Sequence, residues 1–131
     1  MNNPKLQETR RKDILLVDDS FIDLHLLSDI LTTFGYNVRP ARSGFLALRS
    51  AKVKPPDLVL LDINMPDIDG YEVCRQLKSN SFTCSIPIIF VSIYSCITKR
   101  VRAFKAGGAG YITKPVDIDE LLYAVRTNLV Q

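Results

Sequence analysis

The amino-acid sequence predicts an α/β fold built as a doubly wound, five-stranded parallel sheet with five helices on its two faces. Short apolar runs alternate five times with helix-like segments along the 131 residues. Successive βα units of this kind form parallel sheets with right-handed crossovers. The longer runs are apolar at almost every position, as expected of strands buried on both faces. Glycine, proline or a capping side chain stands at most boundaries between the segments.

The strands follow from the apolar runs. The first, third and fourth are nearly continuous apolar stretches, whereas the second is short and contains Pro40, which suits the end or the edge of a sheet strand. The fifth is a brief run just before Lys114. In chain order, the expected strands span residues 14–18, 36–40, 58–62, 86–92 and 111–113.

The helices fill the intervals, and their ends carry recognisable signals. Ser20 is placed to cap the first helix, which Gly35 stops, and Asp117 is placed to cap the last. Pro55-Pro56 ends the second helix, and Gly107-Gly108 ends the fourth. A loop rich in turn formers precedes the third helix. With their caps, the expected helices span residues 20–34, 43–53, 71–78, 98–106 and 117–130.

Composition limits the class of protein. A chain of this length with 47% hydrophobic residues suits one domain, and we expect a flexible lead-in over residues 1–12 and a folded domain over 13–130. The chain has no 18-residue apolar run and no signal-peptide pattern at its N-terminus, so we expect no membrane association. Three cysteines without C-x-x-C spacing favour free thiols in a reducing cytoplasm. The net charge of +3 gives no reason to expect nucleic-acid binding.

Charged side chains follow three of the predicted strands. Asp18 and Asp19 end the first, Asp62 ends the third, and Lys114 follows the fifth. Ligands of such sheets bind beyond the carboxyl ends of the strands, so we expect these residues and Ser92 of the fourth strand to share a pocket. Clustered acids offering only oxygen ligands favour Mg²⁺ over zinc, and the lysine indicates a neighbouring anion. A metal and an anion beside one strand-end aspartate describe a phosphorylatable carboxylate.

These residues resemble the receiver domain of two-component response regulators, of the single-domain, CheY-like type. The similarity covers residues 12–130 and rests on four motifs in combination: VDD at 17–19, LDINMPDIDG at 61–70, VS at 91–92 and YITKP at 111–115. It implies a flavodoxin-like fold with strand order 2-1-3-4-5. It also implies phosphotransfer from the phosphohistidine of a sensor histidine kinase or a histidine phosphotransfer protein. The expected protein is a signalling protein that catalyses only its own aspartyl phosphorylation and dephosphorylation.

The resemblance implies a role for each residue of the pocket. Asp62 is the expected phosphoacceptor, whose carboxylate would attack phosphorus in line and form an acyl phosphate. Lys114, joined to Pro115 by an expected cis peptide bond, would neutralise phosphoryl charge, and Ser92 would donate its hydroxyl to a phosphoryl oxygen. The residues expected to hold Mg²⁺ are Asp18, Asp19, Asp62 and Asn64, the last through its backbone carbonyl.

The resemblance further implies a switch formed by Ser92 and Tyr111. Ser92 would move towards the phosphoryl group and Tyr111 would swing inward, which would reshape the face made by the fourth helix, the fifth strand and the fifth helix. A downstream protein or a second copy of the chain would bind this face. The fourth helix carries several Lys and Arg residues, which suit either an acidic partner or simple solvation.

Two apolar residues of the first helix suggest a docking surface. Ile22 and Leu26 lie off the expected core stripe and next to the acid pair, where they suit a ridge for a kinase helix pair, although single exposed apolar residues are common. The expected core stripe of the first helix consists of Leu24, Leu27, Leu31 and Phe34.

Ile93 replaces the small residue usual in the family and would narrow the route to Asp62.

Other functional classes fit the sequence less well. A haloacid-dehalogenase-type phosphatase would need a second acid two residues after its nucleophile, where this chain has Asn64. A dinucleotide or flavin binder would need a glycine-rich first turn, where this chain has Asp18-Asp19-Ser20. A receiver excised from a hybrid histidine kinase or larger regulator, a phosphorelay carrier and a constitutive, unphosphorylated interaction module stay open as alternatives.

Overall fold

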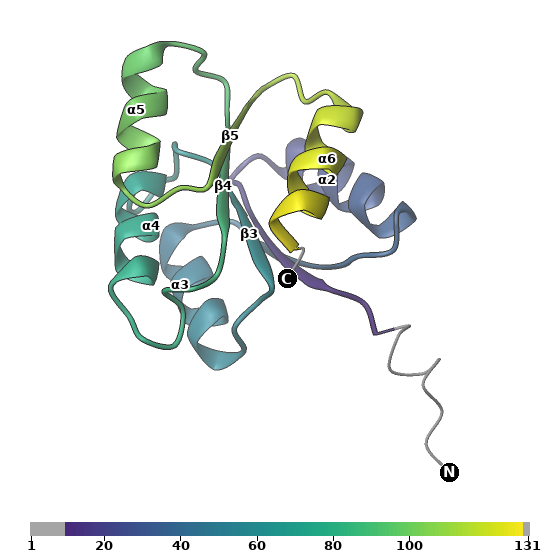
Figure 1. Cartoon of the computed structure of the whole chain (residues 1–131), viewed down its shortest axis with the longest axis horizontal. Helices are drawn as coiled ribbons and strands as arrows, with labels where there is room; N and C mark the ends of the chain where they lie inside the picture. Colours follow the sequence, from purple (N-terminus) through teal and green to yellow (C-terminus); the bar gives the residue numbers. More distant parts are fainter. Residues whose placement is uncertain (1–9, 130–131) are drawn as a thin grey trace.

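The protein folds as a five-stranded parallel sheet covered by helices on both faces (Figure 1). The computed structural model describes residues 10–129, so most of the expected lead-in, residues 1–9, lies outside the described residues. The strand order is β2-β1-β3-β4-β5, and every neighbouring pair is parallel, which confirms the expected topology. The strands are β1 (Asp13–Val17), β2 (Asn37–Ala41), β3 (Leu58–Leu61), β4 (Ile88–Ser92) and β5 (Gly110–Thr113).

Two helices cover one face of the sheet and three cover the other, and each face has its own apolar core. α2 and α6 pack with Ile14 and Leu16 of β1, whereas α3, α4 and α5 pack with Leu15 and Val17. Successive side chains of a strand point to opposite faces, which is why a strand buried on both sides must be apolar throughout. The helices are α2 (Phe21–Thr33), α3 (Gly44–Val53), α4 (Gly70–Lys78), α5 (Ile97–Lys105) and α6 (Ile118–Leu129).

Side-chain caps hold several helices at their expected starts. The Ser20 hydroxyl accepts a hydrogen bond from the Asp23 N–H (3.3 Å), and Asp117 accepts one from the Glu120 N–H (3.0 Å). Each bond satisfies a donor that the first turn of a helix leaves without a backbone partner. Gly35 follows α2 with a φ of 97°, a conformation that glycine adopts readily.

The start of β4 and the exposure of Phe34 differ most from the expected fold, and other boundaries differ by one residue. β4 begins at Ile88 rather than at residue 86, because the Ile86 N–H donates to the carbonyl oxygen of Thr83 (3.1 Å) and residue 86 still belongs to the turn after α4. Phe34 does not continue the core stripe of α2, since its side chain is 58% exposed. Its backbone has left the helical conformation at φ −92° and ψ 13°, so the 3.6-residue period no longer places its side chain over the sheet.

No helix within residues 10–129 combines the length and the apolar character needed to cross a bilayer. Cys74, Cys84 and Cys96 are all free thiols, as their spacing led us to expect. Cys74 is buried, and this burial raises the pKa of its thiol to about 11. A protonated, enclosed thiol of this kind fills space in the core and is a poor nucleophile.

Candidate functional site

The acidic side chains expected to cluster do so at the carboxyl edge of the sheet. Asp18 follows β1, Asp62 follows β3, and these two strands are neighbours. One carboxylate oxygen from each of Asp18, Asp19 and Asp62 lies within 4.8 Å of the others. The backbone secures the arrangement, because the Asp18 N–H donates to Ala41 of β2 (3.1 Å) and the Asp62 N–H donates to Val17 of β1 (3.0 Å). Asp18 and Asp62 are buried, whereas Asp19 is exposed.

Lys114 enters this cluster from the end of β5. Its ammonium group lies 2.7 Å from Asp18 and 3.4 Å from Asp62. It also lies 2.9 Å from Asp23, an acid that the sequence analysis did not include in the site. The Lys114 N–H donates to the carbonyl oxygen of Ser92 (2.7 Å), and the peptide bond from Lys114 to Pro115 is cis, as expected. Lys114 therefore binds three carboxylates, and its backbone is fixed to β4.

Burial and neighbouring charges of both signs shift the pKa values in this cluster. Burial raises the pKa of Asp62 to about 6, because the effects of burial and of the Asp18 charge exceed the opposing attraction of Lys114. Burial alone would lower the pKa of Lys114, but its hydrogen bonds to Asp18 and Asp23 and the charge of Asp62 raise that pKa above its usual range. At neutral pH the site consequently holds a charged lysine among several carboxylates.

Ser92 and Tyr111 are connected through Tyr94, which follows β4 by two residues. The buried Ser92 hydroxyl accepts a hydrogen bond from the Tyr94 N–H (3.1 Å), and the Tyr111 hydroxyl donates to the Tyr94 carbonyl oxygen (2.6 Å). The Tyr111 ring stacks on Phe90 with a centroid distance of 6.4 Å and is buried. In this structure Tyr111 therefore already occupies an inward position.

A side-chain bridge joins the loops after β3 and β4. The Asn64 amide donates to the Tyr94 hydroxyl (2.8 Å), and the Lys99 ammonium lies over the Tyr94 ring at 4.3 Å. Sequence reasoning placed Asn64 at the expected metal site but offered no signal that its side chain binds Tyr94. Tyr94 thus contacts Asn64, Ser92 and Tyr111, and it links the loop after β3 to β5.

The loop from Asp62 to α4 approaches itself too closely for a side chain at Gly70. A Cβ atom there would collide with the Asp62 carbonyl oxygen and lie 2.9 Å from the Ile63 Cα.

The same loop is also fixed to α3. Asp67 accepts hydrogen bonds from the N–H groups of Gly44 (2.9 Å) and Phe45 (2.8 Å) at the start of that helix. Burial works against the charged form, but these bonds lower the pKa of Asp67 to about 2. The loop that carries Asp62 is anchored to both α3 and α4.

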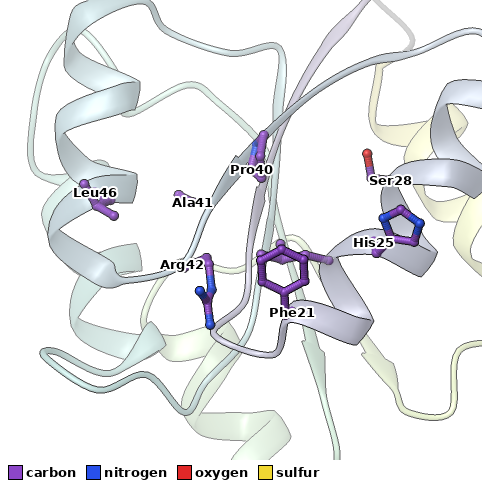
Figure 2. A pocket seen from close by; sticks show the side chains of 8 residues that line it. Phe21, His25, Ser28, Pro40, Ala41, Arg42 and Leu46 are labelled. Carbon is purple, nitrogen blue, oxygen red and sulfur yellow. The ribbon is translucent and has the colours of Figure 1, made fainter.

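The two residues expected to form a docking ridge are exposed beside this cluster. Ile22 is 79% exposed and Leu26 is 55% exposed, both on α2. A largely apolar groove lies next to them between α2, β2 and α3, and Figure 2 shows Phe21 and Arg42 side by side among the residues that line it. Arg42 lies over the Phe21 ring at 5.0 Å, and its guanidinium donates to the Asp19 carbonyl oxygen (3.2 Å). Arg42 therefore joins the loop after β2 to both Asp19 and Phe21.

Comparison with known proteins places this geometry in a family. A family model described as the response regulator receiver domain matches residues 14–126. The protein PilH of Pseudomonas aeruginosa is 36% identical over 116 residues, which cover 88% of this chain and 96% of PilH. The response regulator PleD of Caulobacter vibrioides is 38% identical over 111 residues, covering 85% of this chain and 24% of PleD.

Solved structures of response regulators and receiver domains have the same fold as this chain. A putative response regulator from Chloroflexus aurantiacus superposes with a TM-score of 0.90 at 32% identity and covers 93% of this chain and all of its own. The receiver domain of the sensor histidine kinase PA1611 from Pseudomonas aeruginosa, with magnesium in its active-site cleft, has a TM-score of 0.86 at 28% identity. Its match covers 92% of this chain and 98% of that domain.

The chain therefore belongs to the response regulator receiver domain family and acts in two-component signal transduction. Receiver domains are signalling modules that interact with histidine kinases or phosphotransfer proteins and typically bind Mg²⁺. Several relatives are much longer: the chain spans 24% of ZraR from Klebsiella oxytoca, 48% of RpaA from Synechocystis and 29% of a probable cyclic di-GMP phosphodiesterase from Vibrio cholerae.

Proposed function

We propose that Asp62 accepts a phosphoryl group from the phosphohistidine of a sensor histidine kinase or a histidine phosphotransfer protein. The observation that carries this proposal is the meeting of Asp62 with two further acids and Lys114 at one edge of the sheet. A carboxylate oxygen of Asp62 forms a bond to phosphorus as the bond from phosphorus to the donor imidazole breaks. The catalysis is confined to this self-phosphorylation and to the later hydrolysis of the acyl phosphate.

The donor set fits Mg²⁺. Three carboxylates offer oxygen ligands within 4.8 Å of one another, and none of the free thiols belongs to this group. Mg²⁺ binds through carboxylates together with waters and phosphate oxygens, and when bound it neutralises charge on the phosphoryl group. We assign Asp18, Asp19 and Asp62 as the ligands, with the Asn64 backbone carbonyl completing the set.

Lys114 and Ser92 are the proposed partners of the phosphoryl oxygens. Lys114 is tethered by its N–H to the Ser92 carbonyl oxygen, so the ammonium and the hydroxyl approach the pocket from adjacent strands. A positive charge at this edge stabilises the equatorial oxygens of a transferring phosphoryl group. The Ser92 hydroxyl keeps its own proton available for donation, because its contact with the Tyr94 N–H uses an oxygen lone pair.

We further propose that phosphorylation is read out at the face formed by α5, β5 and α6. Since Tyr111 is already inward and bonded to Tyr94, the phosphoryl group would favour an existing arrangement rather than create a new one. Arg100 of α5 lies over the Tyr111 ring at 5.1 Å, which couples the ring to the basic helix. The proposed occupant of this face is a downstream protein with an acidic surface or a second copy of the chain.

A cytoplasmic location stays a prediction from the cysteine pattern.

The exposed ridge of Ile22 and Leu26 is the proposed docking surface for the phosphodonor. Leu26→Asp should abolish phosphotransfer from the cognate kinase and leave labelling by acetyl phosphate intact. Val53→Asp is a matched control, because Val53 is an exposed apolar residue at the end of α3, 80% accessible and away from α2. Equal loss of both activities in Leu26→Asp would contradict a docking role.

The central proposal is tested by trapping the phosphorylated state. Incubation with Mg²⁺ and beryllofluoride, or with acetyl phosphate, should give one adduct per chain at residue 62, detected by mass spectrometry or by NMR shifts of the Ser92 and Tyr94 amides. Asp62→Asn should form no adduct. A folded, Mg²⁺-loaded protein that forms no adduct at Asp62 would disprove the proposal.

A further inference from the structure

Asp23 is the contact of Lys114 that lies outside the expected site. Its carboxylate is 2.9 Å from the ammonium group, which is closer than the 3.4 Å of Asp62. Asp23 stands in the first turn of α2, where its N–H binds the Ser20 hydroxyl, so its backbone position is held by the helix cap. The side chain reaches from α2 across the acidic cluster to a lysine 91 residues further along the chain.

Lys114 has no spare hydrogen-bond donor in this arrangement. An ammonium group carries three N–H donors and no acceptor. Lys114 makes hydrogen bonds to Asp18, Asp23 and Asp62. A phosphoryl oxygen can bind Lys114 in this geometry only when one of the three carboxylates gives up its contact.

Asp23 differs from the other two partners in what else it contacts. Asp18 and Asp62 belong to the oxygen cluster that suits a divalent cation, and Asp23 does not. A cation bound to Asp18 and Asp62 would neutralise part of their negative charge and weaken their attraction for Lys114. Asp23 would then be the partner that attracts the ammonium group with its full charge. The Asp23 side chain is 36% exposed, against 2% for Asp18 and 12% for Asp62, so water can replace its contact with Lys114.

We propose that Asp23 is a positioning residue that competes with the phosphoryl group for Lys114 and thereby limits how readily Asp62 is phosphorylated. This inference rests on the proposed function of Asp62 and Lys114. Asp23 acts through Lys114 and does not touch the phosphoryl group itself. Replacing its carboxylate by a neutral amide removes the charge that holds the ammonium group, so this contact weakens while the other two stay in place.

The experiment measures the affinity of beryllofluoride, a mimic of the phosphoryl group, at saturating Mg²⁺ by NMR titration of the Ser92 and Tyr94 amides. Asp23→Asn should raise this affinity about two- to fivefold, the range expected for a partly exposed ion pair. Asp23→Glu, which retains the charge, should stay near the wild-type value. The matched control is Asp29→Asn, which removes an exposed carboxylate from the same helix, where it pairs with His25.

A double-mutant cycle separates competition for Lys114 from simple charge repulsion. In a Lys114→Met background the gain from Asp23→Asn should vanish, because no ammonium remains to be released. A gain that persists without Lys114 would overturn the inference and indicate general repulsion of the anion. An unchanged or weaker affinity in Asp23→Asn would overturn it as well.

The two levels of proposal fail in different ways. If wild-type protein with Mg²⁺ forms no beryllofluoride adduct, the assignment of Asp62 fails. If the wild type forms the adduct and Asp23→Asn binds it no more tightly, only the role of Asp23 fails. Thermal unfolding of each variant shows whether the fold is retained, so a loss of affinity through unfolding is recognised directly.

Discussion

Replacing Asp62 by asparagine should stabilise the metal-free protein at neutral pH, even though it removes the proposed phosphoacceptor. Burial and the Asp18 charge raise the pKa of Asp62 from 3.8 to about 6. A carboxyl whose pKa is higher in the folded state favours folding while it is protonated. That contribution is present below the unfolded pKa and is lost as the pH rises through the folded pKa. At pH 7 the ionised side chain consequently opposes folding.

The size of the effect follows from the two pKa values. Each pKa unit is worth about 1.4 kcal/mol, so Asp62→Asn should gain at most about 3 kcal/mol at pH 7 and about 1 kcal/mol at pH 4.5. Asparagine can still accept the hydrogen bond that the Ile63 N–H makes to the side chain (2.7 Å). Lys114 keeps its contacts with Asp18 and Asp23.

Urea unfolding of wild type and Asp62→Asn in the presence of a chelator, at several pH values between 4.5 and 7, measures this difference. Asp29→Asn is the control, since its exposed carboxylate should give little change at any pH. Added Mg²⁺ should shrink the gap, because the metal stabilises the wild type by mass action. A variant that is less stable than the wild type at pH 7, or a gain that does not depend on pH, would refute the reasoning.

Three further predictions follow from the same site. The affinity for Mg²⁺ should fall as the pH is lowered from 7 to 5, because protons compete with the metal for a carboxyl with a pKa of about 6; calorimetry that finds a constant affinity would contradict this assignment. Gly70→Ala should destabilise the protein by about 1–3 kcal/mol in chemical unfolding, since the added Cβ meets the Asp62 carbonyl oxygen. Gly110→Ala, whose Cβ would lie 3.5 Å from Ile89, should change stability much less, and similar losses in both would exclude the steric explanation. Ile93→Ala should speed labelling by acetyl phosphate or hydrolysis of the acyl phosphate, and unchanged rates would remove the idea that Ile93 narrows the route.

Much of the site was accessible to sequence reasoning because a parallel sheet brings strand ends together. Asp18, Asp62 and Lys114 are far apart along the chain, yet each follows a strand, and the carboxyl ends of parallel strands meet at one edge. The alternation of segments predicted the sheet, and the motif resemblance predicted its strand order. The placement of these residues at strand ends depends on where the strands lie along the chain, and the apolar runs specify that locally.

Other features depended on how particular side chains turn once the helices have docked. The pairing of Asp23 with Lys114 and that of Asn64 with Tyr94 join loops and helices whose separation along the chain gives no clue to contact. The exposure of Phe34 followed from the residue at which α2 leaves its helical conformation, which a periodic pattern does not specify. These contacts are set by rotamers and helix termini, where several local arrangements have similar energy.

The sequence by itself determined which residues end the buried strands and therefore which charges must share an edge of the sheet. Only the tertiary structure decided that Lys114 divides its ammonium group among three carboxylates and that Tyr94 connects Ser92 with Tyr111. The physical reason is that strand burial follows from local composition. The choice among nearby hydrogen-bond partners depends instead on atoms that the fold brings together from distant parts of the chain.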